Sequence, residues 1–393
     1  RASEPSPAAW MAFRWFVLPA LLASISAGWA PNPTPAPESH CHFPAIFNFG
    51  DSNSDTGGLS AAFGQVPPPH GESFFGGPAG RYCDGRLTID FIAERLGLPY
   101  LSPYLDAVGA NFTHGANFAT AASTIRTQNT SNGYSPFSLN IQSIQFHEFR
   151  TRSLLFASKE NSTHFTRLPG AEAFSRALYT FDIGQNDLTA GYDLNMTSEE
   201  VVATVPDMLD QFSAVVKSIY GQGGRSFWVH NTGPVGCLPY VMDDGLNITA
   251  YRDAAGCAGE FNDAAKHFNR LLKEAVVRLR RDLPLAVITY VDVYSVKYSL
   301  FTDAKKHGFE EPLRACCGYG GKYNYNRNFR CGATAKVRGK EVLVGKPCRN
   351  PAVRVCWDGV HYTQAANRWI FSRIIDGSYS DPPVPLSMAC HRH

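Results

Sequence analysis

Several features that would point to common classes of protein are missing from this chain of 393 residues. Its charge is nearly balanced, with 36 Lys and Arg against 34 Asp and Glu, so it generates no long-range field that would attract nucleic acid. It has no Cys-x-x-Cys pair, no His-Glu-x-x-His sequence, no Gly-x-Ser-x-Gly elbow and no Gly-X-Y period. We therefore expect no nucleic-acid partner, and the sequence carries no signature of a zincin metal site, of a typical lipase or of collagen.

The composition is that of a large globular domain. Hydrophobic residues make up 44% of the chain and charged residues 18%, which supplies enough apolar surface for a sizeable core. A usual domain of roughly 150 residues would predict two or three domains. However, nothing between residues 43 and 377 resembles an interdomain linker, and we expect a single domain over 43–377 with a short tail at 378–393.

The N-terminal region has the pattern of a secretory signal. Residues 11–30 contain a basic Arg14, a short apolar run and small residues near Ala30, where a signal peptidase would cleave. The apolar run is shorter than the roughly 20 residues that a membrane span needs. Residues 1–10 form an upstream extension, and the Pro-rich segment 31–42 is expected to be a linker. We therefore expect a secreted, extracellular protein without stable membrane insertion.

Cysteines and glycosylation sequons agree with export. The chain has ten Cys, an even number without zinc spacing, which predicts a set of disulfides whose connectivity the sequence leaves open. Five Asn-x-Ser/Thr sequons predict a glycoprotein. The candidate acceptors are Asn111, Asn129, Asn161, Asn195 and Asn247.

Short apolar runs alternate with longer amphipathic segments along the chain. Apolar runs followed by Gly, Asn or Asp predict four strands, at 45–49, 177–183, 226–230 and 285–291. Amphipathic spacing predicts four helices, at 86–96, 197–220 (interrupted near Pro206), 260–281 and 363–375. This alternation predicts an α/β fold with a parallel sheet covered on both faces. The Cys-rich segment 314–356 is expected to be a disulfide-tied excursion from it.

In such sheets ligands bind beyond the carboxyl ends of the strands, and those ends carry candidate catalytic residues. Ser52 follows the first strand, where a serine can be a nucleophile that faces a cleft or an ordinary turn residue. Near the C-terminus, Asp358 precedes His361 by three residues across an Asp-Gly turn. The carboxylate can accept a hydrogen bond from one imidazole nitrogen and leave the other as a base, although a turn followed by a helix-start His explains the pattern equally well.

Two further positions offer hydrogen-bond donors for an oxyanion. Asn186 follows the second strand and has a side-chain amide, although an Asx turn would explain it as well. Gly115 lies in a segment of small residues and could bring its N–H close to a substrate oxygen, or only form a tight junction. A nucleophile, a base with its carboxylate and two neutral donors form the minimum set for acyl transfer.

Several motifs, taken in order along the chain, resemble those of a known family. They are FNFGDSNSDTGG, GRYCDGRLTIDFIAERLGLP, GANFATAAS, DIGQND, NTGPVGCLP and CWDGVHYTQAAN. The chain resembles the plant GDSL-type esterase/lipase family of the SGNH hydrolase superfamily, and most of all its early-nodulin-like and acetylesterase subgroup. The resemblance extends from about residue 43 to residue 377. The chain departs from the family pattern at two places. The GDSL motif that names the family has Leu at its fourth position, where this chain has Asn53. The third motif contains AAS, where AGA or AGS is commoner in the family.

This resemblance implies a fold, an activity and a set of site residues. The fold would be a three-layer, flavodoxin-like α/β/α sandwich with about five parallel strands. Ser52 would be the nucleophile, His361 the base and Asp358 the residue that orients it. The oxyanion hole would consist of the N–H groups of Ser52 and Gly115 with the side chain of Asn186. The family uses no metal and no organic cofactor.

The expected activity is that of a secreted carboxylester hydrolase that removes acetyl groups from a glycoside or a wall polysaccharide in the plant apoplast. The alternatives are a lipase on longer acyl chains, a glycosidase and a non-catalytic carbohydrate-binding glycoprotein. A glycosidase normally needs two facing carboxylates. The loop 66–81, rich in Pro, Gly and aromatics, follows the nucleophile. Its Phe74 and Phe75 would line a substrate pocket or, as commonly, pack against the sheet.

Overall fold

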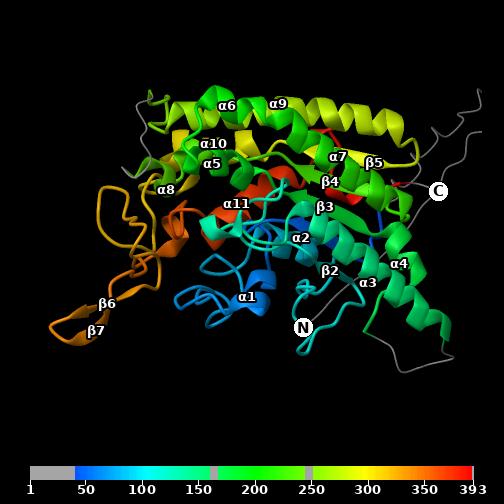
Figure 1. The fold of residues 1–393 in the computed structure, drawn as a ribbon, viewed down its shortest axis with the longest axis horizontal. Helices are drawn as coiled ribbons and strands as arrows, with labels where there is room; N and C mark the ends of the chain where they lie inside the picture. The colour runs from blue at the N-terminus through cyan, green and yellow to red at the C-terminus, as the bar shows by residue number, and fades with distance from the viewer. Residues whose placement is uncertain (1–39, 160–166, 244–250, 392–393) are drawn as a thin grey trace, which may run out of the picture. The chain divides into compact units, whose positions relative to one another are not determined.

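The computed structural model describes residues 40–159, 167–243 and 251–391 (Figure 1). All of them belong to one compact unit, His40–His393. Several sequence-based expectations lie outside the described residues. They are the signal segment 11–30, most of the linker 31–42 and the sequons at Asn161 and Asn247. Within the described residues, no helix is both long enough and apolar enough to cross a membrane.

A six-stranded sheet forms the centre of the fold, in the order β2-β1-β3-β4-β5-β8. The first five strands in that order are parallel, and β8 is antiparallel to β5. All four predicted strands are confirmed as β1, β3, β4 and β5, within two residues at each end, whereas β2 and β8, with three and two residues, are too short for a pattern. The strands are β1 (Ile46–Gly50), β2 (Gly115–Asn117), β3 (Leu178–Asp182), β4 (Ser226–His230), β5 (Val287–Val291) and β8 (Ser380–Asp381).

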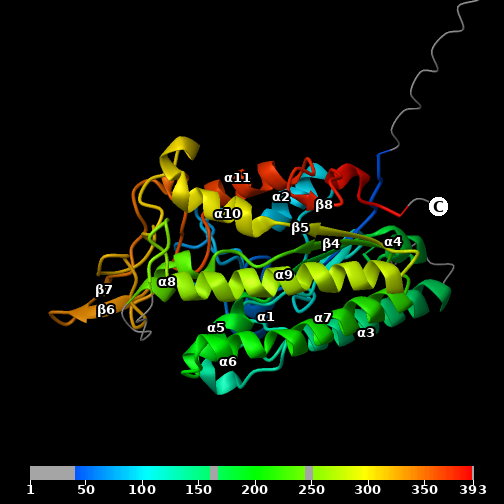
Figure 2. The same ribbon diagram turned by 90° about the horizontal axis from the view of Figure 1, so that it is seen from above.

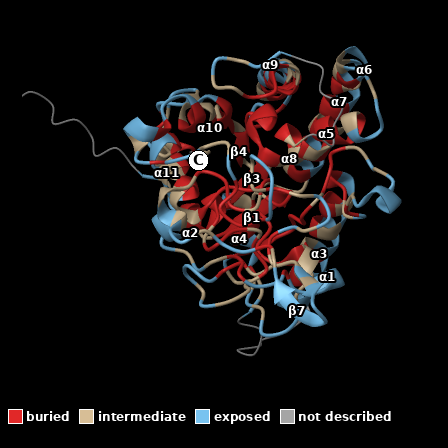
Figure 3. Ribbon diagram, turned by 90° about the vertical axis from the view of Figure 1, so that its left-hand side faces the viewer, coloured by how far each residue is buried: buried red, intermediate tan, exposed pale blue. Residues whose placement is uncertain are grey.

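Both faces of the sheet are buried, because successive side chains of each strand point to opposite faces and both sets are apolar. In β1, for example, Phe47 and Phe49 belong to one core cluster and Ile46 to the other. Figure 3 shows the strands buried in the interior and exposed surface on the outer helices. The sheet is therefore the middle layer of a sandwich.

Two groups of helices form the outer layers (Figure 2). One core cluster joins the sheet to the longer helices α3 (Leu139–Lys159), α7 (Val205–Gly221) and α9 (Gly259–Asp282). The other joins it to α2 (Thr88–Arg95), α10 (Val293–Thr302) and α11 (Gln364–Ile374). The three-layer α/β/α sandwich is therefore confirmed. The shorter helices are α1 (Gly58–Phe63), α4 (Ala171–Arg176), α5 (Gln185–Asp193), α6 (Ser198–Ala203) and α8 (Pro239–Met242).

The predicted helices are confirmed with small changes of boundary. The segment 197–220 is two helices, α6 and α7, which are separated at Thr204, two residues before Pro206. Thr197 caps α6 by accepting a hydrogen bond from the Glu200 N–H, and the Glu200 carboxylate accepts one from the Thr197 N–H. Pro206 lies in the first turn of α7, where its missing N–H costs nothing.

The Cys-rich segment 314–356 is an excursion that carries a two-stranded hairpin, β6 (Thr334–Val337) and β7 (Lys340–Leu343). Two disulfides hold it, Cys316–Cys348 and Cys317–Cys331. Two more join Cys41 to Cys390 and Cys237 to Cys257.

The predicted set of disulfides is confirmed, and it pairs eight of the ten cysteines. Cys83 and Cys356 are free and fully buried in the cluster beneath α2 and α11. Burial raises the pKa of both thiols, Cys356 far above its usual range. They are therefore small apolar core residues that pack as thiols.

Candidate active site

Ser52, Asn186, Asp358 and His361 line a single cavity of about 670 Å³. Ser52 lies two residues beyond the end of β1, and Asn186 is in the first turn of α5, which follows β3. His361 lies three residues before α11. The cavity therefore opens at the carboxyl ends of the parallel strands, where this class of sheet places its ligands.

The turn that carries Ser52 is held from both sides. The side-chain amide of Gln142, on α3, accepts a hydrogen bond from the Gly50 N–H (2.9 Å) and donates one to the Gly50 carbonyl (2.8 Å). Beyond Gly50, the Asp51 carboxylate accepts hydrogen bonds from the backbone and side-chain amides of Asn53. Ser52 is only 4% exposed and lines the cavity.

Asp358 and His361 form the pair that the Asp-Gly turn predicts. Oδ2 of Asp358 lies 2.7 Å from Nδ1 of His361, and Oδ1 accepts the N–H groups of Val360 and His361. Gly359 between them has a φ of 97°, and a Cβ there would lie 2.4 Å from the Tyr325 ring, so the turn requires glycine.

The electrostatics of this pair suit a base and its orienting carboxylate. Burial by itself would raise the pKa of Asp358, but the charge and hydrogen bond of His361, with a smaller contribution from His70, hold that pKa well below its usual range. Asp358 therefore stays ionised. Nε2 of His361 is buried and has no hydrogen-bond partner among the described residues, which leaves it available to a ligand of the cavity.

Three N–H donors of the cavity wall remain for an oxygen atom. Asn186 gives one amide hydrogen to the Ser123 carbonyl (2.8 Å) and keeps the other. The backbone N–H groups of Ser52 and Ala122 have no acceptor among the described residues. Ala122 has a φ of 61°, an unusual conformation for a residue with a Cβ, and it belongs to the cavity lining.

The structure does not bring Gly115 to this site, and the prediction that it belongs to the oxyanion hole is wrong. Gly115 pairs with Ile46, the first residue of β1, whereas Ser52 follows the last, and β1 spans about 13 Å. The Gly115 N–H donates to the Phe112 carbonyl. The end of β2 instead delivers Ala122, seven residues after Gly115.

Asp55 places the Ala122 segment beside the nucleophile turn. Its carboxylate caps α1 by accepting the N–H groups of residues 57, 58 and 59, and it also accepts the Ala121 N–H at 2.7 Å. The sequence analysis missed this role. Asp55 lies two residues before the N-cap Gly57, so the usual N-cap position does not reveal it.

The remaining walls of the cavity are mainly polar and aromatic. From the loop 66–81 the lining includes Pro67 and His70 but neither Phe74 nor Phe75. The lining also includes Asp193, which accepts a hydrogen bond from the Tyr134 hydroxyl (2.8 Å) and lies 3.5 Å from the Arg327 guanidinium. Tyr240, Tyr325 and Arg330 also line the cavity.

A second buried cluster of charged groups lies beneath Ser52. Nδ1 of His230 is 3.0 Å from an Asp182 oxygen, and Nε2 of His230 accepts the indole N–H of Trp228 (3.1 Å). Burial, and then the neighbouring Asp182, raise the pKa of Asp51 to about 7. Lys297 and His230 outweigh the effect of burial at Asp182 and lower its pKa. Asp51 is therefore the member of this cluster that holds a proton.

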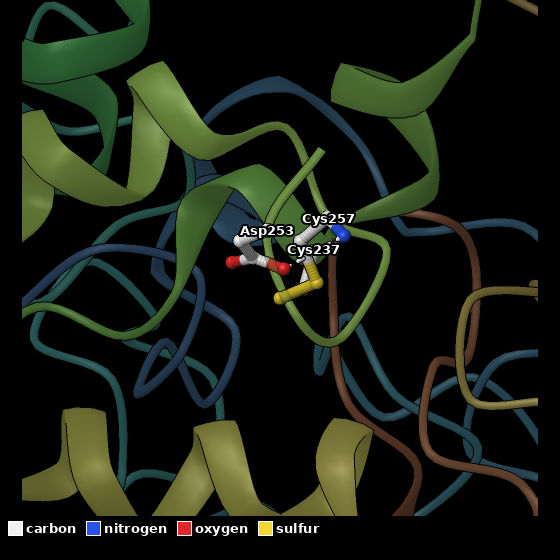
Figure 4. Close-up of side chains that lie close together, drawn as sticks. All are labelled: Cys237, Asp253 and Cys257. Carbon is white, nitrogen blue, oxygen red and sulfur yellow. Dashed lines mark hydrogen bonds between the residues drawn. A yellow bond between two sulfur atoms is a disulfide. The ribbon is translucent and has the colours of Figure 1, made fainter. Parts of the chain in front are cut away.

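One group of potential metal ligands occurs in the described part of the chain, at Cys237, Asp253 and Cys257. The two sulfur atoms are joined in a disulfide, as Figure 4 shows. The Asp253 carboxylate accepts the N–H groups of Ala255 and Cys257 and a hydrogen bond from Asn262. These atoms therefore hold a loop together, and disulfide sulfurs are not the thiolate ligands that a metal requires.

Comparison with known proteins shows the family to which this chain belongs. Residues 46–374 match the model of the GDSL-like lipase/acylhydrolase family, which makes this chain a hydrolase of ester bonds. The chain belongs to this GDSL family, as its motifs predict. It is 57% identical over 376 residues to alpha-L-fucosidase 3 of Arabidopsis thaliana, covering 95% of this chain and 96% of that protein.

Two other relatives show the same extent of similarity. A GDSL esterase/lipase of Arabidopsis thaliana is 55% identical over 355 residues, covering 90% of this chain and 93% of that protein. An esterase of Hevea brasiliensis is 57% identical over 358 residues, with 90% of each chain covered. Among solved structures, a catalytic mutant of an acetylxylan esterase from Geobacillus stearothermophilus is 14% identical, with a TM-score of 0.33 over 86% of this chain and 94% of that one.

Proposed function

We propose that this protein is a secreted serine carboxylester hydrolase that releases short acyl groups, chiefly acetyl, from a glycoside or a cell-wall polysaccharide. One observation carries the proposal. Ser52, the hydrogen-bonded pair Asp358–His361 and the amide of Asn186 line the same cavity. A nucleophile, a base, an orienting carboxylate and oxyanion donors are what acyl transfer requires.

The residues act in two half-reactions. His361 takes the hydroxyl proton of Ser52 through Nε2 while Oγ attacks the ester carbonyl, and Asp358 stabilises the imidazolium that forms. The N–H groups of Ser52 and Ala122 and the amide of Asn186 receive the oxyanion. His361 returns the proton to the leaving alcohol, and the acyl group stays on Ser52. Water, activated by the same imidazole, then hydrolyses the acyl-enzyme.

The polar wall of the cavity supports a carbohydrate as the alcohol part of the ester. Tyr134 donates a hydrogen bond to Asp193, which also forms an ion pair with Arg327, and these polar groups suit sugar hydroxyls. Tyr240 and Tyr325 add ring surface against which the apolar face of a sugar can pack. A long acyl chain would instead need a continuous apolar groove, and this wall does not provide one.

The name of one relative, an α-L-fucosidase, suggests glycoside hydrolysis as a competing activity. That reaction normally needs two carboxyl groups about 5–10 Å apart on either side of the bond. The carboxylates of the cavity lining are Asp193 and Asp358, and each is already engaged, by Tyr134 and Arg327 or by His361. The geometry therefore favours ester hydrolysis.

Secretion and glycosylation are part of the proposal. Four disulfides within the described residues support an oxidising compartment. The sequon residues Asn111, Asn129 and Asn195 are exposed and therefore accessible to a glycosylating enzyme. We propose residues 11–30 as the signal and 43–377 as the single catalytic domain.

A substrate panel tests the function. We expect wild-type protein to cleave p-nitrophenyl acetate faster than longer-chain esters, to release acetate from acetylated xylan, and to leave p-nitrophenyl α-L-fucoside intact. Ser52→Ala should abolish ester cleavage with an unchanged thermal unfolding curve, and the control Ser73→Ala, at an exposed serine outside the cavity, should behave as wild type. A wild-type rate in Ser52→Ala, or cleavage of the fucoside alone, would overturn the proposal.

A further inference from the structure

His70 is a second histidine beside the carboxylate of the site. It is 4% exposed and lines the same cavity as Ser52. Its Nε2 lies 3.6 Å from Oδ2 of Asp358, the oxygen that also binds Nδ1 of His361. Its Nδ1 lies 2.8 Å from the carbonyl oxygen of Pro67. The His70 ring is therefore flanked on both nitrogens by oxygen atoms that only accept hydrogen bonds.

The two flanking oxygens decide where protons fit on this ring. A carbonyl oxygen cannot donate, so the hydrogen bond to Pro67 places a proton on Nδ1. Nε2 is buried and has no hydrogen-bond partner among the described residues. The Asp358 oxygen, 3.6 Å away, lies just beyond hydrogen-bond distance, so a small movement of either side chain would bring the two into contact.

We propose that His70 is a positioning residue that holds the Asp358 carboxylate in place, so that one carboxylate oxygen contacts two histidines. This inference rests on the proposed function. The contact restrains the carboxylate that orients the ring of His361, and through it the position of the base.

Other groups near His70 do not replace Asp358 as its partner. Trp357 packs edge-on against the ring and does not titrate. Tyr82 also packs edge-on, and burial followed by Asp55 and Asp358 raises the pKa of Tyr82 to about 12, so it is neutral. The remaining titratable or charged groups are His361 on the same carboxylate, Tyr325 and Arg330 in the lining of the same cavity, and the exposed Glu72 two residues along the loop.

Two variants test the positioning role. His70→Phe removes the donor to the carboxylate, and kcat should fall about tenfold with little change in KM. His70→Gln retains an N–H donor and should restore part of the lost kcat. Glu72→Gln, at an exposed residue of the same loop, is the control and should match wild type. Equal kcat values in wild type and both His70 variants, or equal losses in His70→Gln and His70→Phe, would overturn the proposal.

A measurement without substrate makes the inference independent of the esterase assignment. The ¹⁵N chemical shifts of the His70 ring, assigned by the loss of these signals in His70→Gln, should differ between wild type and Asp358→Asn at one fixed pH, because the variant changes the group beside Nε2. Identical shifts would refute the pairing even in an active enzyme. If Ser52→Ala kept the wild-type rate, the proposed function would fail, and the chemical shifts would still decide the His70–Asp358 pairing.

Discussion

The side-chain amide of Gln142 forms two hydrogen bonds with the backbone of Gly50, one to the N–H and one to the carbonyl. Gln142 belongs to α3 and Gly50 ends β1, 92 residues earlier in the chain. The Gly50 carbonyl also accepts the Thr120 N–H (3.3 Å), whereas the Gly50 N–H has the Gln142 side chain as its acceptor. The outer layer of the sandwich therefore holds the strand end that presents the nucleophile.

Replacing Gln142 should affect both stability and rate. Gln142→Ala leaves the buried N–H and carbonyl of Gly50 without these partners, and we expect a loss of about 2 kcal/mol in the free energy of unfolding. We also expect a lower kcat with little change in KM, because the Ser52 turn loses its support. Urea unfolding and steady-state kinetics measure the two effects. Asn140→Ala, at an exposed residue of the same helix, is the control, and equal effects in both variants would contradict the prediction.

Asn186 should act chiefly in the transition state. Asn186→Ala removes one donor to the oxyanion, and we expect kcat to fall on the order of 10²- to 10³-fold with KM nearly constant. The variant also loses the hydrogen bond to the Ser123 carbonyl, so its unfolding curve must be recorded alongside. Asn132→Ala changes an exposed asparagine of the same cavity and should retain kcat. A large rise in KM at constant kcat would show that Asn186 binds the ground state instead.

The stability of the protein should depend on pH through Asp51. Burial and the nearby Asp182 raise the pKa of Asp51 from 3.8 to about 7 in the folded state, so folding favours the protonated acid. The stabilisation from that proton is fully present below about pH 4 and is lost as the pH rises through about 7. Asp51→Asn should remove this loss.

Urea unfolding at about pH 4 and about pH 8 measures the effect in wild type and in the variant. The wild type should lose more stability between these pH values than Asp51→Asn does. Asp210→Asn, at an exposed aspartate of α7, is the control and should follow wild type. Parallel pH dependence in all three proteins would contradict a protonated Asp51.

The sequence predicts the parts of the site that depend on local patterns. The four longer parallel strands are apolar runs that end in Gly, Asn or Asp, and Ser52 and Asn186 follow two of them. The pairing of Asp358 with His361 depends only on an Asp-Gly turn, whose geometry three residues determine. The hydrogen bond between them is present as predicted.

The parts that could not be predicted depend on contacts between distant segments. Helix α3 was missed because its buried face includes the polar Gln142 and Ser143, while Ile144 is 51% exposed, which conceals the amphipathic pattern. Gly115 was chosen for its lack of a side chain, yet the register of β2 with β1 puts it at the wrong end of the sheet. Ala122 takes that place only because Asp55 binds the adjacent residue.

The disulfide between Cys41 and Cys390 links residues 349 positions apart in the chain. Almost every peptide bond of the described residues therefore lies inside one covalent ring. A single proteolytic cut in any surface loop of that ring releases no fragment until the bridge is reduced, so nicked enzyme migrates as one intact species on a non-reducing gel. Tolerance of a single backbone cut is thus a property that this one bridge confers on the molecule.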